Sequence, residues 1–335
     1  MEGSFKAVKV TSILTGNSAH EWGTKKQIIM DRWLNIVNEK WSICSPDYSV
    51  LSKTEEEGYV CKRIEYTAPD GDTVPALLLL PHYEGEKLPG ILALHPTDEK
   101  GKMDIAHRSG RKERSYGIEL AKRGYAVLAP DTITAGDRVG KGERPFETKG
   151  FYERYPSRTA AGKMMADHLQ GIEVLASMQE TDQNRIGVIG HSLGGYNAYF
   201  LATVEKRIKA IVCSCGFSMM AGDPERHRWG KRDWFSHFPV ISDWIDNGEI
   251  PFDFHEILSL CAPVPLFLWM CRNDPVFPHW KEALNGILEV QKVYDGLAEK
   301  DSFDWMIGSS GHEFPSAIRE HSYQFLDRYL KFTTR

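Results

Sequence analysis

Hydrophobic residues along this chain fall into short continuous runs that alternate with longer amphipathic segments. The runs predict strands, and the three-to-four-residue spacing in the longer segments predicts helices. Continuous apolar strands are typical of a parallel sheet that is buried on both faces. We expect strands at 59–66, 73–80, 90–95, 125–129, 185–189, 208–215, 264–270 and 303–307, and helices at 24–41, 115–123, 159–178, 196–203, 280–297 and 316–332.

This order of elements predicts an α/β fold. Strands that alternate with helices form a mostly parallel sheet, covered by helices on both faces and connected by right-handed crossovers. The first two strands are the exception, because the turn sequence Ala68-Pro69-Asp70-Gly71-Asp72 between them predicts an antiparallel hairpin. The helix at 24–41 follows a threonine cap at Thr24 and is expected to pack on the main body as part of an N-terminal helical extension, residues 1–58.

Two long segments interrupt the alternation. Residues 132–158 are rich in glycine and charge, and residues 217–261 are rich in aromatic side chains, including Trp229 and Trp234. Both segments follow strands at their carboxyl ends, where open α/β sheets bind ligands. We therefore expect them to form the walls and cap of a substrate pocket. The alternative for the aromatic segment is a small helical subdomain whose aromatic side chains fill their own core.

Composition narrows the class of partner. The chain has 335 residues, of which 41% are hydrophobic, and this is enough for a large core. Its net charge of −5 offers no electrostatic case for binding nucleic acid or an anionic membrane. Residues 1–6 show no basic run followed by an apolar segment, and no apolar run reaches membrane-spanning length. We expect a cytoplasmic protein that acts on small neutral or modestly charged molecules.

The six cysteines show no C-x-x-C spacing and lie mostly in apolar runs, so they are expected to be reduced thiols in the core. Cys213 and Cys215 are two residues apart in a predicted strand, and we expect them on one face of the sheet. The sequence contains neither a metal-ligand cluster nor a phosphate-binding glycine loop. It therefore predicts no metal and no cofactor.

The strongest motif lies between the strand at 185–189 and the helix at 196–203. It reads Gly190-His191-Ser192-Leu193-Gly194, a G-x-S-x-G nucleophile elbow with a strand before it and a helix after it. A serine at this sharp turn stands clear of the sheet, and larger side chains two residues away would collide with the strand and the helix. Ser192 is therefore the predicted nucleophile. The alternative is a glycine-rich turn that only packs tightly.

The chain resembles the α/β-hydrolases, and among them the dienelactone-hydrolase-like and acetyl xylan esterase-like groups. The resemblance covers roughly residues 24–332 and implies an α/β-hydrolase catalytic domain at 59–335, with lid segments at about 132–158 and 217–261. Dienelactone hydrolases proper use a cysteine nucleophile, whereas this chain has Ser192. The matching pieces are 182–195 around the elbow, Tyr125-Ala-Val-Leu-Ala-Pro130-Asp131 with Gly136-Asp-Arg138, and the N-terminal segment 71–81.

A serine nucleophile needs a base and an acid that orients the base, in the chain order Ser, Asp or Glu, His. His312 lies in a glycine-containing loop after the last predicted strand and is the expected base. Asp274 is the carboxylate in the loop after the strand at 264–270 and is the expected acid. His321 inside the final helix is expected to be a solvated residue. Asp301 and Asp304 compete with Asp274 by sequence alone, but they lie at the wrong end of the sheet.

The oxyanion hole should use two backbone N–H groups, one from Leu193 and one from the loop after the strand at 90–95. The family pattern in that loop is His-Gly-x, and here it reads His95-Pro96-Thr97. Because proline has no N–H, Thr97 is the expected second donor and Asp98 is the alternative. His95 is expected mainly to brace this loop. The candidate substrate-binding residues are His95, His191, Trp229 and Trp234.

Together these residues predict a serine hydrolase that cleaves carboxylic esters. The resemblance, rather than any residue, implies a short acyl group such as acetate. A peptidase, an amidase or a thioesterase would use the same triad, and a non-catalytic binding protein of the same fold is a further alternative. The expected partner is a small-molecule ester, and exposed aromatic side chains of the cap leave a homo-oligomer open.

Overall fold

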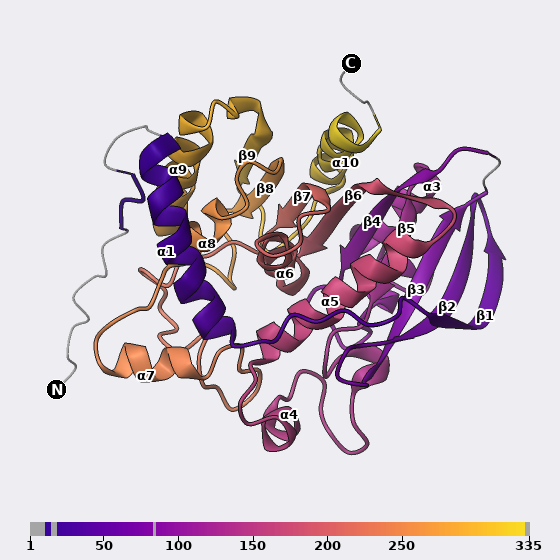
Figure 1. Ribbon diagram of the computed structural model, residues 1–335, viewed down its shortest axis with the longest axis horizontal. Coiled ribbons are helices and arrows are strands. Elements are labelled where there is room, and N and C mark those ends of the chain that lie inside the picture. The colour runs from indigo at the N-terminus through magenta and orange to yellow at the C-terminus, as the bar shows by residue number, and fades with distance from the viewer. Residues whose placement is uncertain (1–10, 15–18, 83–84, 332–335) are drawn as a thin grey trace.

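Nine strands form one central sheet in the computed structural model, which describes residues 11–14, 19–82 and 85–331 (Figure 1). The strand order is β1-β2-β3-β5-β4-β6-β7-β8-β9. Neighbours from β5 to β9 are parallel, whereas β1, β2, β3 and β5 pair antiparallel. The strands are β1 Tyr48–Glu56, β2 Tyr59–Thr67, β3 Thr73–Pro81, β4 Leu88–Leu94, β5 Ala126–Pro130, β6 Thr181–His191, β7 Ile208–Ser214, β8 Leu266–Cys271 and β9 Phe303–Gly308.

The predicted parallel core and the predicted hairpin are confirmed, but strand β1 was not predicted. β1 lies at the edge of the sheet, and most of its side chains are exposed on both faces. Its sequence therefore lacks the apolar run or clean alternation that marks a buried strand. Residues 48–56, within the predicted N-terminal extension, are thus part of the sheet and pair with β2.

Helices cover both faces of the sheet (Figure 1). Buried side chains of α1, α5, α6, α8 and α9 share one core cluster, and those of α2, α3 and α10 share the other. The helices are α1 Ala19–Val37, α2 Met103–Ala106, α3 Tyr116–Lys122, α4 Lys149–Arg154, α5 Ala160–Ser177, α6 Leu193–Ala202, α7 Val240–Asp246, α8 Phe254–Ser259, α9 Trp280–Gly296 and α10 Ser316–Leu330, with short 3-10 turns η1 Lys112–Arg114, η2 Gly136–Arg138 and η3 Lys300–Ser302.

The strands of the core are apolar on both faces because each face packs against a helical layer. In β4, Leu92 and Leu94 belong to the α5 and α6 side, and Ile91 and Ala93 belong to the α3 and α10 side. All four side chains are fully buried. This is the arrangement that the continuous hydrophobic run predicts.

Helix α1 begins and ends earlier than predicted, so Thr24 lies inside it and not at its start. Its buried Trp33 packs against Phe200, Phe238 and Phe252, with ring centroids 4.8 to 5.5 Å away. The indole Nε1 of Trp33 donates to Thr203 Oγ1 at 3.0 Å. Phe332, the predicted end of the last helix, and residues 1–6 lie outside the described residues.

All six cysteines lie in the described part of the chain and are free. The expectation that Cys213 and Cys215 share one face is wrong, because Cys213 belongs to one core cluster and Cys215 to the other. β7 ends at Ser214, and Cys215 has a φ of 46°, which breaks the alternation of the strand. Among the described helices, none combines the length and apolar character needed to cross a membrane.

Candidate active site

The nucleophile elbow forms between β6 and α6. Ser192 has φ 55° and ψ −119°, a conformation that non-glycine residues rarely adopt. Its N–H donates to Ser214 O of the neighbouring strand at 2.7 Å, and its carbonyl accepts from Tyr196 N at 3.1 Å. These bonds hold the strained residue in place at the start of the helix.

The two glycines of the motif are required by close backbone contacts. A Cβ on Gly190 would lie 2.1 Å from the carbonyl carbon of Gly194, and a Cβ on Gly194 would lie 2.0 Å from Leu94 O. Gly216, which the motif does not include, has the same constraint, because its Cβ would lie 2.5 Å from Tyr196 N. The elbow therefore packs directly against the ends of β4 and β7.

The structure brings Ser192, Asp274 and His312 together. His312 Nε2 lies 2.7 Å from Ser192 Oγ, and His312 Nδ1 lies 2.6 Å from Asp274 Oδ2. Because a carboxylate only accepts hydrogen bonds, Nδ1 carries the proton, and Nε2 is left to accept from the serine hydroxyl. This tautomer is the one that a general base requires.

Asp274 is held in position by the backbone that follows it. Its Oδ1 accepts from Val276 N at 2.7 Å and from Phe277 N at 3.1 Å. The side chain is almost fully buried. These bonds leave Oδ2 to His312 and fix the direction in which the carboxylate faces.

The competing residues lie apart from the elbow. His321 pairs with Asp304 at 2.8 Å, in a contact between α10 and β9. Asp301 accepts a hydrogen bond from Tyr329 through its backbone carbonyl. None of these three residues is hydrogen-bonded to Ser192 or to His312.

A cavity of about 310 Å³ opens beside Ser192 and His312. The cap segment 217–261 supplies Trp229, Trp234 and Phe235 to its wall. Thr97 and Phe277 also line it. Other aromatic side chains of the cap, such as Phe238 and Phe252, pack against Trp33 instead. The aromatic segment therefore divides into a part that lines the cavity and a part that anchors the cap on α1.

Segment 132–158 supports this wall from behind. Phe146 makes edge-on contacts with Trp234 and Phe235 at 6.2 and 5.9 Å between ring centroids. Thr148 N donates to Trp234 O at 3.1 Å, and Tyr152 OH donates to Ser236 O at 2.9 Å. None of its described residues lines the cavity beside Ser192.

His95 and His191 do not reach the cavity. Both are fully buried. Thr132 N donates to His95 Nε2 at 3.1 Å, so His95 Nδ1 carries the proton and donates to Pro96 O at 2.7 Å. Burial lowers the pKa of His95, in agreement with a neutral ring that braces the loop before Thr97. His191 stacks on Phe314, with centroids 6.1 Å apart.

Sequence reasoning missed one polar pair in the cavity. Tyr196 OH lies 2.6 Å from His237 Nε2, and both residues line the cavity. Burial, followed by the nearby charges of Arg232 and Arg228, lowers the pKa of His237 to about 3, so this ring is neutral. Tyr196 follows Ser192 by four residues on one helix, and this spacing could have placed it beside the nucleophile.

Three arginines at the cavity wall are already paired with carboxylates. Arg228 contacts Asp223 at 2.6 Å and Arg232 contacts Glu225 at 2.8 Å. Arg114 lies 3.4 Å from Asp104. Each arginine at the cavity wall therefore has a carboxylate partner.

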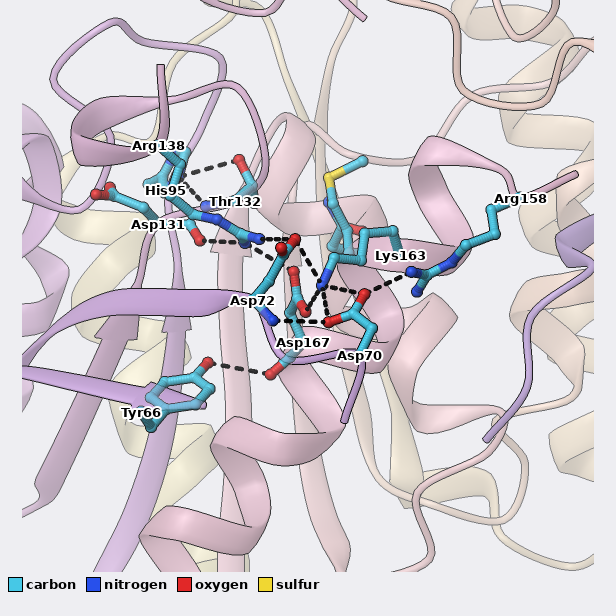
Figure 2. Close-up of polar contacts among 12 residues, drawn as sticks. Tyr66, Asp70, Asp72, His95, Asp131, Thr132, Arg138, Arg158, Lys163 and Asp167 are labelled. Carbon is cyan, nitrogen blue, oxygen red and sulfur yellow. Dashed lines mark hydrogen bonds and ion pairs between the residues drawn. The ribbon is translucent and has the colours of Figure 1, made fainter. Parts of the chain in front are cut away.

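A buried ionic network ties segment 132–158 to helix α5 and to the β2–β3 turn (Figure 2). Arg138 contacts Asp167 at 2.7 Å and Asp72 at 3.6 Å. Lys163 lies 2.7 Å from both Asp70 and Asp167. Figure 2 shows these side chains converging on one point, with His95 and Thr132 beside them. The network holds the base of the segment that supports the cap.

The structure also gathers metal-ligating atoms that the sequence keeps far apart. Cys215 Sγ, a carboxylate oxygen of Asp274 and a ring nitrogen of His312 all lie within 4.8 Å of one another. Each residue follows a different strand, so no local spacing could reveal this cluster.

Sequence similarity connects the chain to known hydrolases. The sequence model of the family described as acetyl xylan esterase (AXE1) matches residues 39–219, a range that includes Ser192 but ends before Asp274 and His312. A curated relative from Bacillus subtilis, named "Putative hydrolase YtaP", is 27% identical over 265 residues, which cover 77% of this chain and 84% of the relative.

Solved structures share the fold at low sequence identity. A glucuronoyl esterase from Solibacter usitatus has a TM-score of 0.68 and 19% identity, and covers 92% of this chain and 93% of its own. Acetyl xylan esterase 1 from Thermoanaerobacterium sp. has a TM-score of 0.59 and 17% identity, and covers 90% of this chain and 93% of its own. These likenesses confirm the predicted α/β-hydrolase fold.

Proposed function

This chain belongs to the acetyl xylan esterase (AXE1) family, and we propose that it hydrolyses carboxylic esters through an acyl-enzyme on Ser192. The observation that carries this proposal is the continuous hydrogen-bonded line from Ser192 through His312 to Asp274, with distances of 2.7 and 2.6 Å. In this mechanism His312 is the base and Asp274 the orienting acid.

The reaction proceeds in two steps. Ser192 Oγ attacks the ester carbonyl while His312 Nε2 takes its proton, and the resulting imidazolium is stabilised by Asp274. The tetrahedral intermediate collapses when its bond to the leaving alcohol breaks, and His312 returns the proton to that alcohol. Water then attacks the acyl-enzyme with the same proton transfers, which releases the acid and regenerates Ser192.

Two backbone N–H groups are proposed to bind the oxyanion. Leu193 is the first residue of α6, and first-turn amides have no acceptor within a helix. Thr97 lies on the cavity wall, in the loop that His95 braces. His95 is thus a positioning residue in this proposal, and it does not touch the substrate.

A short acyl group fits the proposal best. The cavity volume of about 310 Å³ lies at the small end of ligand pockets. The family description adds acetyl esters of a sugar polymer as the leading substrate class. Trp229 and Trp234 offer flat apolar faces to such a substrate. Amide or thioester cleavage by the same residues remains the second candidate.

Hydrolysis of p-nitrophenyl esters from acetate to decanoate tests this function. We expect turnover to fall with chain length, and kcat/KM of Ser192→Ala to drop by on the order of 10⁴ or more. His312→Asn should lose activity similarly. His321→Asn is the matched control, because His321 also pairs with an aspartate, at 2.8 Å, but lies away from Ser192.

Equal activity in Ser192→Ala and the wild type would refute the mechanism. If no ester is cleaved, labelling by a fluorophosphonate probe decides between the alternatives. Labelling that requires Ser192 would favour an amide or thioester substrate, whereas absence of labelling would favour a protein without catalysis.

A further inference from the structure

Cys215 lies directly beside the proposed triad, although no step of ester hydrolysis uses it. β7, β8 and β9 are neighbours in the sheet (Figure 1), and their carboxyl ends carry Cys215, Asp274 and His312. The thiol Sγ of Cys215 donates to Glu313 O at 3.4 Å, next to His312 in the chain. Its backbone N–H donates to Trp269 O at 2.7 Å, which fixes it against β8.

A second thiol contacts Cys215 and lies next to the group of three ligand atoms. Cys271 Sγ lies 3.7 Å from Cys215 Sγ and 3.3 Å from Ser310 Oγ. Two thiolates bound to one tetrahedral zinc ion, with Zn–S distances of about 2.3 Å, lie about 3.8 Å apart. The two sulfur atoms are therefore already at the separation that a shared zinc ion requires.

The donor types suit the same metal. Thiolate sulfur, imidazole nitrogen and carboxylate oxygen are the ligands that zinc prefers, and tetrahedral sites commonly combine them. The sulfur of Cys215, an oxygen of Asp274 and a nitrogen of His312 lie within 4.8 Å of one another, so shifts of about 1 Å would bring them onto one ion. His312 lines the cavity beside Ser192, which gives the ion a path from solvent.

We propose that Zn²⁺ binds reversibly to Cys215, Asp274 and His312 and switches the hydrolase off, and that the thiol of Cys271, 3.7 Å from that of Cys215, moves in as the fourth ligand. As each sulfur binds, its thiol releases one proton to solvent, and the imidazole binds as the neutral ring. An imidazole held by the metal cannot both donate to Asp274 and accept from Ser192. The loss of activity rests on the proposed function, but the binding does not.

Cadmium titration of the reduced full-length protein tests the site without reference to activity. Cd²⁺ binds thiolates as zinc does and produces an ultraviolet charge-transfer band. We expect one equivalent of Cd²⁺ to give this band in the wild type. Cys215→Ala and Cys271→Ala should each lose most of it. Cys61→Ala is the matched control, because Cys61 is also a buried thiol but lies on β2.

Zinc inhibition of p-nitrophenyl acetate hydrolysis provides the second measurement. Loss of outer contacts to a metal costs about 10–100-fold in affinity, so Cys215→Ala should require at least about tenfold more zinc for half inhibition. Chelation by EDTA should restore activity in the wild type. Inactivation that responds to dithiothreitol but not to EDTA would instead indicate oxidation of the thiol pair and would overturn the proposal.

Two further outcomes separate this proposal from the catalytic one. A wild-type protein without the cadmium band, or equal zinc inhibition of the wild type and Cys215→Ala, would refute the metal site whatever the enzyme hydrolyses. A protein that cleaves no ester but shows the band, and loses it in Cys215→Ala, would retain the metal site and refute the esterase. Circular dichroism of each variant verifies that it is folded.

Discussion

Ser192 holds a backbone conformation that costs on the order of 1–3 kcal/mol for a residue with a side chain. The surrounding contacts offset this cost, because the serine amide and carbonyl are both hydrogen-bonded and the flanking glycines allow the strand, the turn and the helix to touch. At the scale of single residues, the position of Ser192, the proposed nucleophile, thus depends on the absence of side chains at Gly190 and Gly194.

Gly194→Ala tests this dependence. The added Cβ would lie 2.0 Å from Leu94 O and 3.0 Å from His95 O. Both are backbone oxygen atoms, so a side-chain rotation cannot relieve the contact. We expect a loss of about 1–3 kcal/mol or more in the free energy of unfolding, measured in urea, and a loss of ester hydrolysis. The displaced loop carries Thr97, the proposed second oxyanion donor.

Gly23→Ala is the matched control for this experiment. Gly23 lies in α1, and no atom stands within 4 Å of the Cβ that it would gain. Alanine is the better helix former by about 0.5–1 kcal/mol, so this variant should be as stable as the wild type or more so. Equal stability of Gly194→Ala and the wild type would show that the elbow is looser than the contacts indicate.

At the scale of elements, the buried ionic network decides how the cap is supported. Arg138 stands in η2, which five residues separate from the end of β5, and its partners Asp72 and Asp167 come from the hairpin turn and from α5. Buried hydrophobic side chains of the segment, among them Ala135 and Phe146, add to this attachment. The charges of segment 132–158 therefore serve its attachment, while its Phe146 reaches the cap.

Arg138→Met should be strongly destabilising. Removal of one partner from a buried ion pair leaves the other charge uncompensated and costs about 3–5 kcal/mol. Asp167 would retain Lys163 at 2.7 Å, which limits the loss. The measurement is the unfolding midpoint in urea. Arg144→Met is the control, since Arg144 pairs with Glu147 at an exposed site and should change the midpoint little.

Similar midpoints for Arg138→Met and Arg144→Met would contradict the role of the network. A lower midpoint together with an unchanged KM would show that the segment supports stability but not the shape of the cavity. A rise in KM for p-nitrophenyl acetate would extend the effect to the cap.

Much of the element order could be predicted because the core strands leave a clear signal. β5 and β8 are buried along their whole length and β4, β6 and β7 along most of theirs, so their apolar runs stand out from the amphipathic helices. β1 left no such signal, because it is an exposed edge strand. Ser192, Asp274 and His312 could be proposed from chain order and strand ends.

The remaining parts of the site arise from contacts between distant segments. His237 meets Tyr196 across 41 residues, and Cys215 meets Cys271 across 56. Arg138 meets Asp167 by crossing from η2 to α5. No periodicity encodes such pairs, since each depends on how the cap and the loops fold back over the sheet. His191 lies behind the cavity wall for the same reason, because its buried ring packs between His312 and Phe314, with centroids 5.0 and 6.1 Å away.

At the scale of the whole molecule, acid should unfold the protein through its paired carboxylates. Burial raises the pKa of Asp70, but hydrogen bonds from Arg158 and Lys163 outweigh it and lower the pKa from 3.8 to about 2. Burial likewise raises the pKa of Asp137, but Lys102 and Arg63 outweigh this effect and lower that pKa below its ordinary value. A depressed pKa in the folded state stabilises the protein above the unfolded pKa, and this contribution disappears as the pH falls.

Asp70→Asn should therefore make the unfolding midpoint lower at neutral pH and less sensitive to acid. The difference from the wild type should be constant above about pH 5 and shrink between about pH 4 and 2. Urea unfolding across this pH range measures it. Asp47→Asn is the control, because Asp47 is exposed and accepts from Ser45. A difference that persists unchanged at about pH 2 would contradict the ionic origin of the stability.

The order of the triad along the chain has a consequence for synthesis. Ser192 precedes His312 by 120 residues, and His312 reaches it only after β9 has joined β8 at the edge of the sheet. During synthesis, Ser192 therefore leaves the ribosome well before His312, the proposed base, has been added to the chain. Under the proposed mechanism, we therefore expect ester hydrolysis to begin only after β9 has docked on β8.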